Sequence, residues 1–172
     1  VFALAAHPEE DLLASGSADG TVRLWRFSTG EHLRTLAGHT GAVTSLACSK
    51  EWLFSGSGSD DRTLCVWSWK TGLCARVIEL DAALWLNSVA WRDSRLITLE
   101  ERGAVRVWDT SSHDPSAWSR TRTLPERSSS WENVAATARY IACVAPGDKT
   151  AIALWEYDPV SAIMGKQHFL KS

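Results

Sequence analysis

The sequence has few of the features that mark membrane, nucleic-acid-binding or metal-binding proteins. No apolar run approaches the roughly 20 residues that a membrane helix needs. The 18 basic and 20 acidic residues nearly balance, so there is no positive field to attract nucleic acid or an anionic membrane. The five histidines are scattered, and no pair has the spacing of a zinc site. We therefore expect no nucleic acid, membrane, metal or cofactor among the partners of this chain.

Cysteine is also scarce. Cys48, Cys65, Cys74 and Cys143 have no Cys-x-x-Cys spacing, so we expect buried thiols that act as small apolar side chains. Unpaired cysteines favour a reducing compartment. The expected location is therefore the cytoplasm, with the nucleus as the alternative.

What the sequence does contain is tryptophan and a repeat. There are ten tryptophans in 172 residues. Four of them lie at or near the end of similar stretches, at residues 15–25 (SGSADGTVRLW), 57–67 (SGSDDRTLCVW), 103–109 (GAVRVWD) and 150–156 (TAIALWE). The tryptophans at 25, 67, 108 and 155 lie 42, 41 and 47 residues apart. A period of about 40–45 residues made of short strands indicates the four-stranded blades of a β-propeller.

The repeats resemble those of the WD40 family. A Gly38-His39 pair precedes the second repeat, and Asp19 and Asp61 each stand six residues before a tryptophan. The third repeat ends in the dipeptide Trp108-Asp109 that characterises the family. The resemblance covers nearly the whole chain, and it is strongest in the first two repeats.

This resemblance implies an all-β, WD40-type β-propeller with about four blades of four antiparallel strands. The whole chain, residues 1–172, is then one repeat region, with blades expected at residues 1–37, 38–80, 81–125 and 126–172. WD40 proteins usually close a ring of about seven blades, so we expect a four-repeat portion of a larger ring. A closed four-bladed ring is the alternative. As an isolated chain it is expected to self-associate, because the two end blades have uncovered apolar faces.

The second repeat contains the residue types of a hydrolase triad, but the resemblance implies a structural role for them. In WD40 blades such residues form a hydrogen-bonded relay, here expected among His39, Ser57, Asp61 and Trp67. An aspartate can accept the imidazole proton, the imidazole can accept a hydroxyl proton, and the buried indole N–H gains a partner. No G-x-S-x-G motif accompanies the serine, so no catalytic residue is expected. The first repeat retains part of the relay, as Ser15, Asp19 and Trp25.

A propeller usually binds its partners at one rim of the ring. Loops that lead into the inner strands, and turns between the second and third strands, form this rim. The residues expected there are Asp60, Trp85, Glu101, Arg102 and Trp131. Exposed aromatic residues flanked by charge are typical binding anchors. Filling of the central channel is the alternative for the two tryptophans, and simple solvation is the alternative for the charged residues.

The resemblance implies a non-catalytic protein–protein interaction scaffold or substrate-recognition module of a multiprotein complex. A narrower alternative is the substrate-receptor subunit of a ubiquitin ligase. A remote alternative is a propeller enzyme, or an accessory domain of one, with its site in the channel. The expected inner strands Val43–Cys48 and Leu86–Trp91 offer almost no acid–base groups, which disfavours the enzyme.

Overall fold

The structure, a computed structural model, describes residues 1–58, 61–80, 86–100, 104–123, 133–137, 140–144, 151–157 and 164–171. Within these ranges the chain forms sixteen strands in four antiparallel sheets. The first sheet comprises β1 (Ala3–Ala6), β2 (Leu12–Gly16), β3 (Val22–Arg26) and β4 (His32–Leu36). The second comprises β5 (Val43–Cys48), β6 (Trp52–Ser57), β7 (Thr63–Ser68) and β8 (Cys74–Glu79). The third comprises β9 (Leu86–Arg92), β10 (Arg95–Glu100), β11 (Val105–Asp109) and β12 (Ser119–Thr123). The fourth comprises β13 (Val134–Ala136), β14 (Tyr140–Val144), β15 (Ala151–Tyr157) and β16 (Met164–Lys171).

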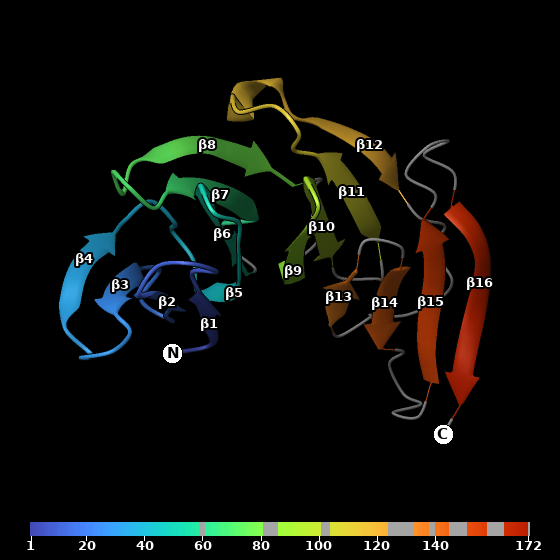
Figure 1. The fold of residues 1–172 in the computed structure, drawn as a ribbon, viewed down its shortest axis with the longest axis horizontal. Coiled ribbons are helices and arrows are strands. Elements are labelled where there is room, and N and C mark those ends of the chain that lie inside the picture. The colour runs from blue at the N-terminus through green and yellow to red at the C-terminus, as the bar shows by residue number, and fades with distance from the viewer. Residues whose placement is uncertain are drawn as a thin grey trace.

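The four sheets follow one another along an arc (Figure 1). The first strand of each sheet lies on the inner side of the arc and the last strand lies on the outer side. The strands of each sheet pair in the order in which they occur in the sequence. The all-β propeller architecture that the repeat predicted is confirmed.

Tight turns connect consecutive strands within the sheets. Gly30 before β4 and Gly72 before β8 both have φ of +71°, a left-handed conformation that glycine adopts without steric cost. Each donates its N–H to the carbonyl four residues earlier, at 2.8 Å. Asp93 and Ser94 connect β9 to β10 with φ of +48° and +60°. This is the geometry of a type I′ turn, whose twist matches that of the strands it joins.

The apolar core is divided among the contacts between neighbouring sheets. The first cluster joins Ala14, Val22, Leu24 and Leu36 to Val43, Leu53, Cys65, Trp67 and Trp69. The second joins Phe54, Leu64, Val66, Ile78 and Leu80 to Leu86, Val89, Leu96, Trp108 and Trp118. The third joins Ile97, Leu99, Val105 and Val107 to Val134, Ile141 and Cys143. Because successive residues of a strand point to opposite faces of its sheet, the second and third sheets each pack against both of their neighbours.

Helical structure in the described residues is limited to a short 3-10 turn, η2 (Pro115–Ala117), between β11 and β12. Asp114 caps this turn by accepting a hydrogen bond from the Ser116 backbone N–H at 2.9 Å. No helix in the same part of the chain is long and apolar enough to cross a membrane.

Candidate functional site

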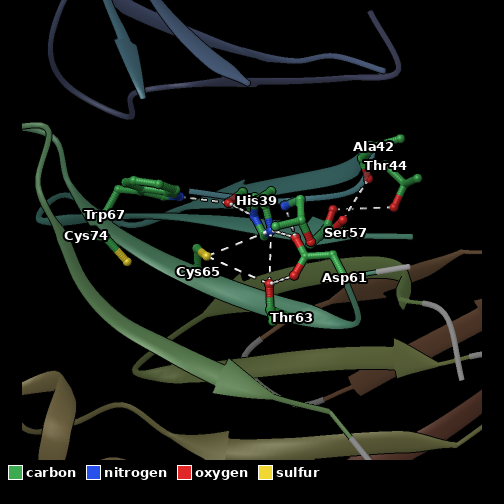
Figure 2. Close-up of polar contacts among 12 residues, drawn as sticks. His39, Ala42, Thr44, Ser57, Asp61, Thr63, Cys65, Trp67 and Cys74 are labelled. Carbon is green, nitrogen blue, oxygen red and sulfur yellow. Dashed lines mark hydrogen bonds and ion pairs between the residues drawn. The ribbon is translucent and has the colours of Figure 1, made fainter. Parts of the chain in front are cut away.

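A cluster of hydrogen-bonded polar side chains lies in the second sheet (Figure 2). His39 Nδ1 is 2.6 Å from Asp61 Oδ2, and His39 Nε2 is 2.7 Å from Ser55 Oγ. The indole N–H of Trp67 donates to the same Ser55 oxygen at 2.7 Å. These contacts fit a neutral imidazole that donates its Nδ1 proton to Asp61 and accepts the Ser55 hydroxyl proton at Nε2. The predicted grouping of His39, Asp61 and Trp67 is therefore present.

The relay serine is Ser55, and the prediction of Ser57 was wrong. Trp67 lies opposite Leu53 in the β6–β7 register, and Ser55 is two residues farther along β6. Ser57 is a further two residues away, or roughly 7 Å along the strand. Its hydroxyl donates instead to the Ala42 carbonyl at 3.0 Å. The two serines share a face of the strand, so the cross-strand register with Trp67, and not the spacing along the sequence, decides which of them joins the relay.

The Gly38-His39 pair has a packing reason in this arrangement. A Cβ at Gly38 would lie 2.9 Å from Cη2 of Trp67, closer than such atoms normally approach. Glycine at this position lets the backbone pass over the indole. His39 can then reach both Asp61 and Ser55 from the loop that precedes β5.

Hydrogen bonds hold the Asp61 carboxylate in its ionised form. Thr63 Oγ1 donates to Oδ1 at 2.8 Å, and the Thr40 backbone N–H donates to Oδ2 at 3.0 Å. Burial alone would raise the pKa of Asp61, but the hydrogen bonds from Thr63 and His39 outweigh it, and the pKa is lowered. The carboxylate is therefore charged at neutral pH.

This lowered pKa makes part of the stability depend on pH. An aspartate with a lower pKa in the folded state stabilises the fold above its unfolded pKa of about 3.9. That contribution is lost as the pH falls through the folded value. We expect Asp61→Asn to be less stable than wild type at pH 7, and the difference to shrink below about pH 4 as Asp61 takes up a proton. Urea unfolding of both proteins at several pH values measures this. A difference that stays constant with pH would contradict the expectation.

The order of groups, Ser55–His39–Asp61, is that of a hydrolase triad, but burial makes it inaccessible. Ser55 has no exposed surface, and neither has the His39 side chain. The Ser55 oxygen also accepts the Trp67 indole proton. A catalytic serine must reach a substrate carbonyl that lies beside an oxyanion hole. We infer that this relay links the loop before β5 to β6 and β7, and that its role is structural.

The first and third sheets keep the hydroxyl–tryptophan half of the relay. Trp25 donates to Ser15 Oγ at 2.8 Å, as predicted. Trp108 donates to Thr98 Oγ1 at 3.1 Å, a bond that sequence reasoning missed. Thr98 stands ten residues before Trp108, as Ser15 stands ten residues before Trp25, but the same spacing selects Ser57 instead of Ser55 in the second repeat.

Asp19, predicted to belong to the relay of the first repeat, instead closes its own turn. Its Oδ1 accepts from the Thr21 backbone N–H at 3.0 Å and from the Thr21 hydroxyl at 2.6 Å. Its Oδ2 pairs with Arg23 at 3.1 Å. The hydrogen bonds from Thr21 lower the pKa of Asp19 to about 2. No described bond joins Asp19 to Ser15 or Trp25, so the first repeat keeps only the serine–tryptophan bond of the predicted relay.

The third sheet contains a buried ion pair that sequence reasoning also missed. Arg106 on β11 bonds through Nη1 to Oε1 of Glu100, at the end of β10. Their side chains are 8% and 0% exposed. Arg106 stands two residues before Trp108, the position that Arg23 holds before its own tryptophan. The first sheet therefore carries an exposed version of this pair and the third sheet a buried one.

The four cysteines are free, but the expected burial holds only for Cys65 and Cys143. Burial raises the pKa of Cys65 to about 12, and that of Cys143 to about 12. Burial also raises the pKa of the half-buried Cys48, whereas Cys74 is exposed. Among the described residues no cluster of histidine, cysteine or carboxylate side chains could hold a metal ion.

The residues of the predicted binding rim lie outside the described ranges. These residues are Asp60, Trp85, Glu101, Arg102 and Trp131. Their grouping on one rim stays a prediction.

A groove that the sequence did not indicate lies among the turns of the first three sheets. Its volume is about 440 Å³, and its lining includes the half-buried Trp52 and Trp91. Arg92 pairs with Asp93 at 3.5 Å at its edge. The groove therefore combines two indoles with a compensated charge pair.

The arc of four-stranded sheets, the tryptophan period and the buried relay together define a WD-repeat β-propeller. Residues 1–26 and 30–68 match the family model described as WD40, the WD domain or G-beta repeat. The chain belongs to the WD40 repeat family.

The similar proteins include one that is named as a subunit of a translation initiation factor. Eukaryotic translation initiation factor 3 subunit I of Aspergillus terreus is 35% identical over 109 residues, which are 60% of this chain and 32% of that protein. Human Pleiotropic regulator 1 is 36% identical over 130 residues, which are 67% of this chain and 25% of that protein. The chain thus matches about a third or less of the length of these relatives. The crystal structure of the computationally designed protein Ika4 superimposes with a TM-score of 0.74 at 25% identity, covering 90% of this chain and 89% of that one.

Proposed function

We propose that this chain is a non-catalytic protein-interaction scaffold, acting as a recognition module of a multiprotein complex. The observation that carries this proposal is the burial of Ser55, His39 and Asp61, its most catalytic-looking residues, in a relay that supports the sheet. The name of one relative, a subunit of a translation initiation factor, is consistent with a role inside a larger assembly.

The inner strands support a binding role over an enzymatic one. β1, β5, β9 and β13 read ALAA, VTSLAC, LNSVAWR and VAA. They contain no aspartate, glutamate, histidine or lysine, so the described inner surface has few groups for acid–base chemistry. Proteins or peptides in the cytoplasm or nucleus are the proposed partners. No described residue favours the ubiquitin-ligase receptor over other binding roles.

The proposed binding surface is the rim that carries Trp85 and Trp131, together with Asp60, Glu101 and Arg102. Tryptophans are frequent anchors of protein interfaces, and truncating such an anchor costs about 2 kcal/mol or more. That cost corresponds to a loss of affinity of roughly 30-fold. The groove beside Trp52 and Trp91 lies at turns between other strands, and it provides a comparison surface.

The test is quantitative affinity purification from cell extract with three variants of matched expression. Trp85→Ala combined with Trp131→Ala removes the proposed anchors. Arg92→Ala combined with His113→Ala alters the groove, because both residues line it. Leu73→Ala is a control at an exposed residue in the turn between β7 and β8. We expect the first variant to lose the partners of the wild type while the other two keep them. Circular dichroism checks that each variant folds. Recovery of every partner by the Trp85/Trp131 variant overturns the rim, and failure of the wild type to recover any partner overturns the function.

A further inference from the structure

Where two neighbouring sheets of the arc pack together, the same two kinds of surface meet, and we call them the two halves of one pattern. The first half is a pair of aliphatic residues on the third strand of the leading sheet. These pairs are Val22 and Leu24, Leu64 and Val66, and Val105 and Val107, all at most 4% exposed. The second half is a tryptophan on the next sheet with its cross-strand neighbour. These are Trp67 with Leu53, and Trp108 with Leu96.

The first sheet presents the second half of this pattern without a cover. Trp25 lies opposite Leu13 in the β2–β3 register, and both are only half-buried. Val1, Leu4 and Phe27 lie beside them with 62% to 79% of their surface exposed. Together these five residues line an apolar groove of about 250 Å³. In the second and third sheets the same face is buried under the preceding sheet.

The fourth sheet presents the first half of the pattern without a cover. Ile152 and Leu154 stand three residues and one residue before Trp155, as Val105 and Val107 stand before their tryptophan. The register agrees, because Leu154 lies opposite Ala142 just as Val107 lies opposite Ile97. Ile152 is 39% exposed and Leu154 is half-buried, whereas Val105 and Val107 are each 1% exposed.

The charges that border the groove are already compensated. Arg23 pairs with Asp19 at 3.1 Å, and Arg26 pairs with Glu31 at 3.2 Å. This face therefore offers apolar surface and little net charge to an occupant. A sheet with aliphatic residues at the positions of Val22 and Leu24 fits it, because that is what covers the same face of the second sheet.

We propose that, when the 172-residue chain is on its own, a second copy docks head to tail on the first sheet, so that Ile152 and Leu154 of one copy cover Trp25 and Leu13 of the other. The first and fourth sheets lie at opposite ends of the arc (Figure 1), so they do not cover each other within one molecule. Two copies that pair at both ends form a closed dimer of eight sheets, which is within the range of known propellers. This contact is separate from the proposed rim, and it does not depend on the proposed function.

The test is the mass of the 172-residue chain in solution, measured by sedimentation velocity over a range of concentrations. Leu4→Asp combined with Phe27→Asp disrupts the face of the first sheet, and Ile152→Asp disrupts the face of the fourth. Leu73→Asp, in the β7–β8 hairpin of the second sheet, is the control, because Leu73 is also exposed but lies on neither face. We expect dimers for the wild type and the control, and dissociation constants raised at least tenfold for each face variant.

A mixture of the two face variants distinguishes head-to-tail pairing from other arrangements. One variant keeps an intact fourth sheet and the other keeps an intact first sheet, so the mixture should associate more strongly than either variant alone. Circular dichroism verifies folding. If an aspartate variant does not fold, Phe27→Ser takes the place of the first-sheet variant, and Ile152→Thr takes the place of the fourth-sheet variant. A monomeric wild type overturns the proposal. So does an Ile152→Asp protein that dimerises as the wild type does, because that result indicates contact between two first sheets.

Discussion

Replacing Arg106 by methionine is expected to lower the free energy of unfolding by about 3–5 kcal/mol, because the change removes a positive charge that is paired with the fully buried Glu100 carboxylate. Glu100 is fully buried, and Arg106 bonds to it from the neighbouring strand. Methionine keeps much of the length of the arginine side chain, so the loss of charge pairing is larger than the loss of packing.

Two further variants make this expectation specific. Arg23→Met removes the equivalent arginine of the first sheet, whose pair with Asp19 is exposed. It should therefore cost less than about 1 kcal/mol. Glu100→Leu combined with Arg106→Met removes both charges and should recover most of the stability, because apolar residues often replace a buried ion pair without loss. Urea unfolding at pH 7 measures all three. Equal losses for Arg23→Met and Arg106→Met would contradict the role of burial.

The sequence predicted the fold well because the repeat carries redundant information. The tryptophan that ends each third strand recurs at nearly constant spacing, and glycine marks the left-handed turns before β4 and β8. A strand that was misread in one repeat could be corrected from another. The family resemblance supplied the propeller arrangement, which short strands and turns alone do not specify.

Side-chain partners were less predictable, and the reasons are physical. Ser55 and Ser57 share a strand face, so only the cross-strand register shows that Ser55 lies near Trp67. Glu100 and Arg106 are charged, and charged residues are rarely buried unless they are paired. The pairing that buries these two depends on contacts between neighbouring strands. The sequence predicted that the two end blades have uncovered apolar faces. It did not show that the face of the first sheet is complementary to that of the fourth, which required a comparison of the residues buried between the other sheets.

The two serines of β6 are expected to respond very differently to replacement by alanine. Ser55→Ala removes the atom that joins His39 to Trp67, so it leaves a buried imidazole nitrogen and a buried indole N–H without that partner. Each stranded group costs about 1–3 kcal/mol, and we expect a total loss of about 2–4 kcal/mol. Ser57→Ala removes one donor to the Ala42 carbonyl, which still accepts the Gly58 backbone N–H at 2.9 Å. We expect it to cost less than about 1 kcal/mol.

The measurement is urea unfolding of the two variants beside the wild type, followed by far-UV circular dichroism so that a local change at Trp67 does not distort the reading. Both substitutions remove one hydroxyl from the same face of one strand, so strand propensity and side-chain size are matched. The difference between the variants then reports the relay itself. If Ser57→Ala were the more destabilising of the two, the contacts of Ser55 with His39 and Trp67 would contribute little, and Ser55 would not be the serine on which the relay depends.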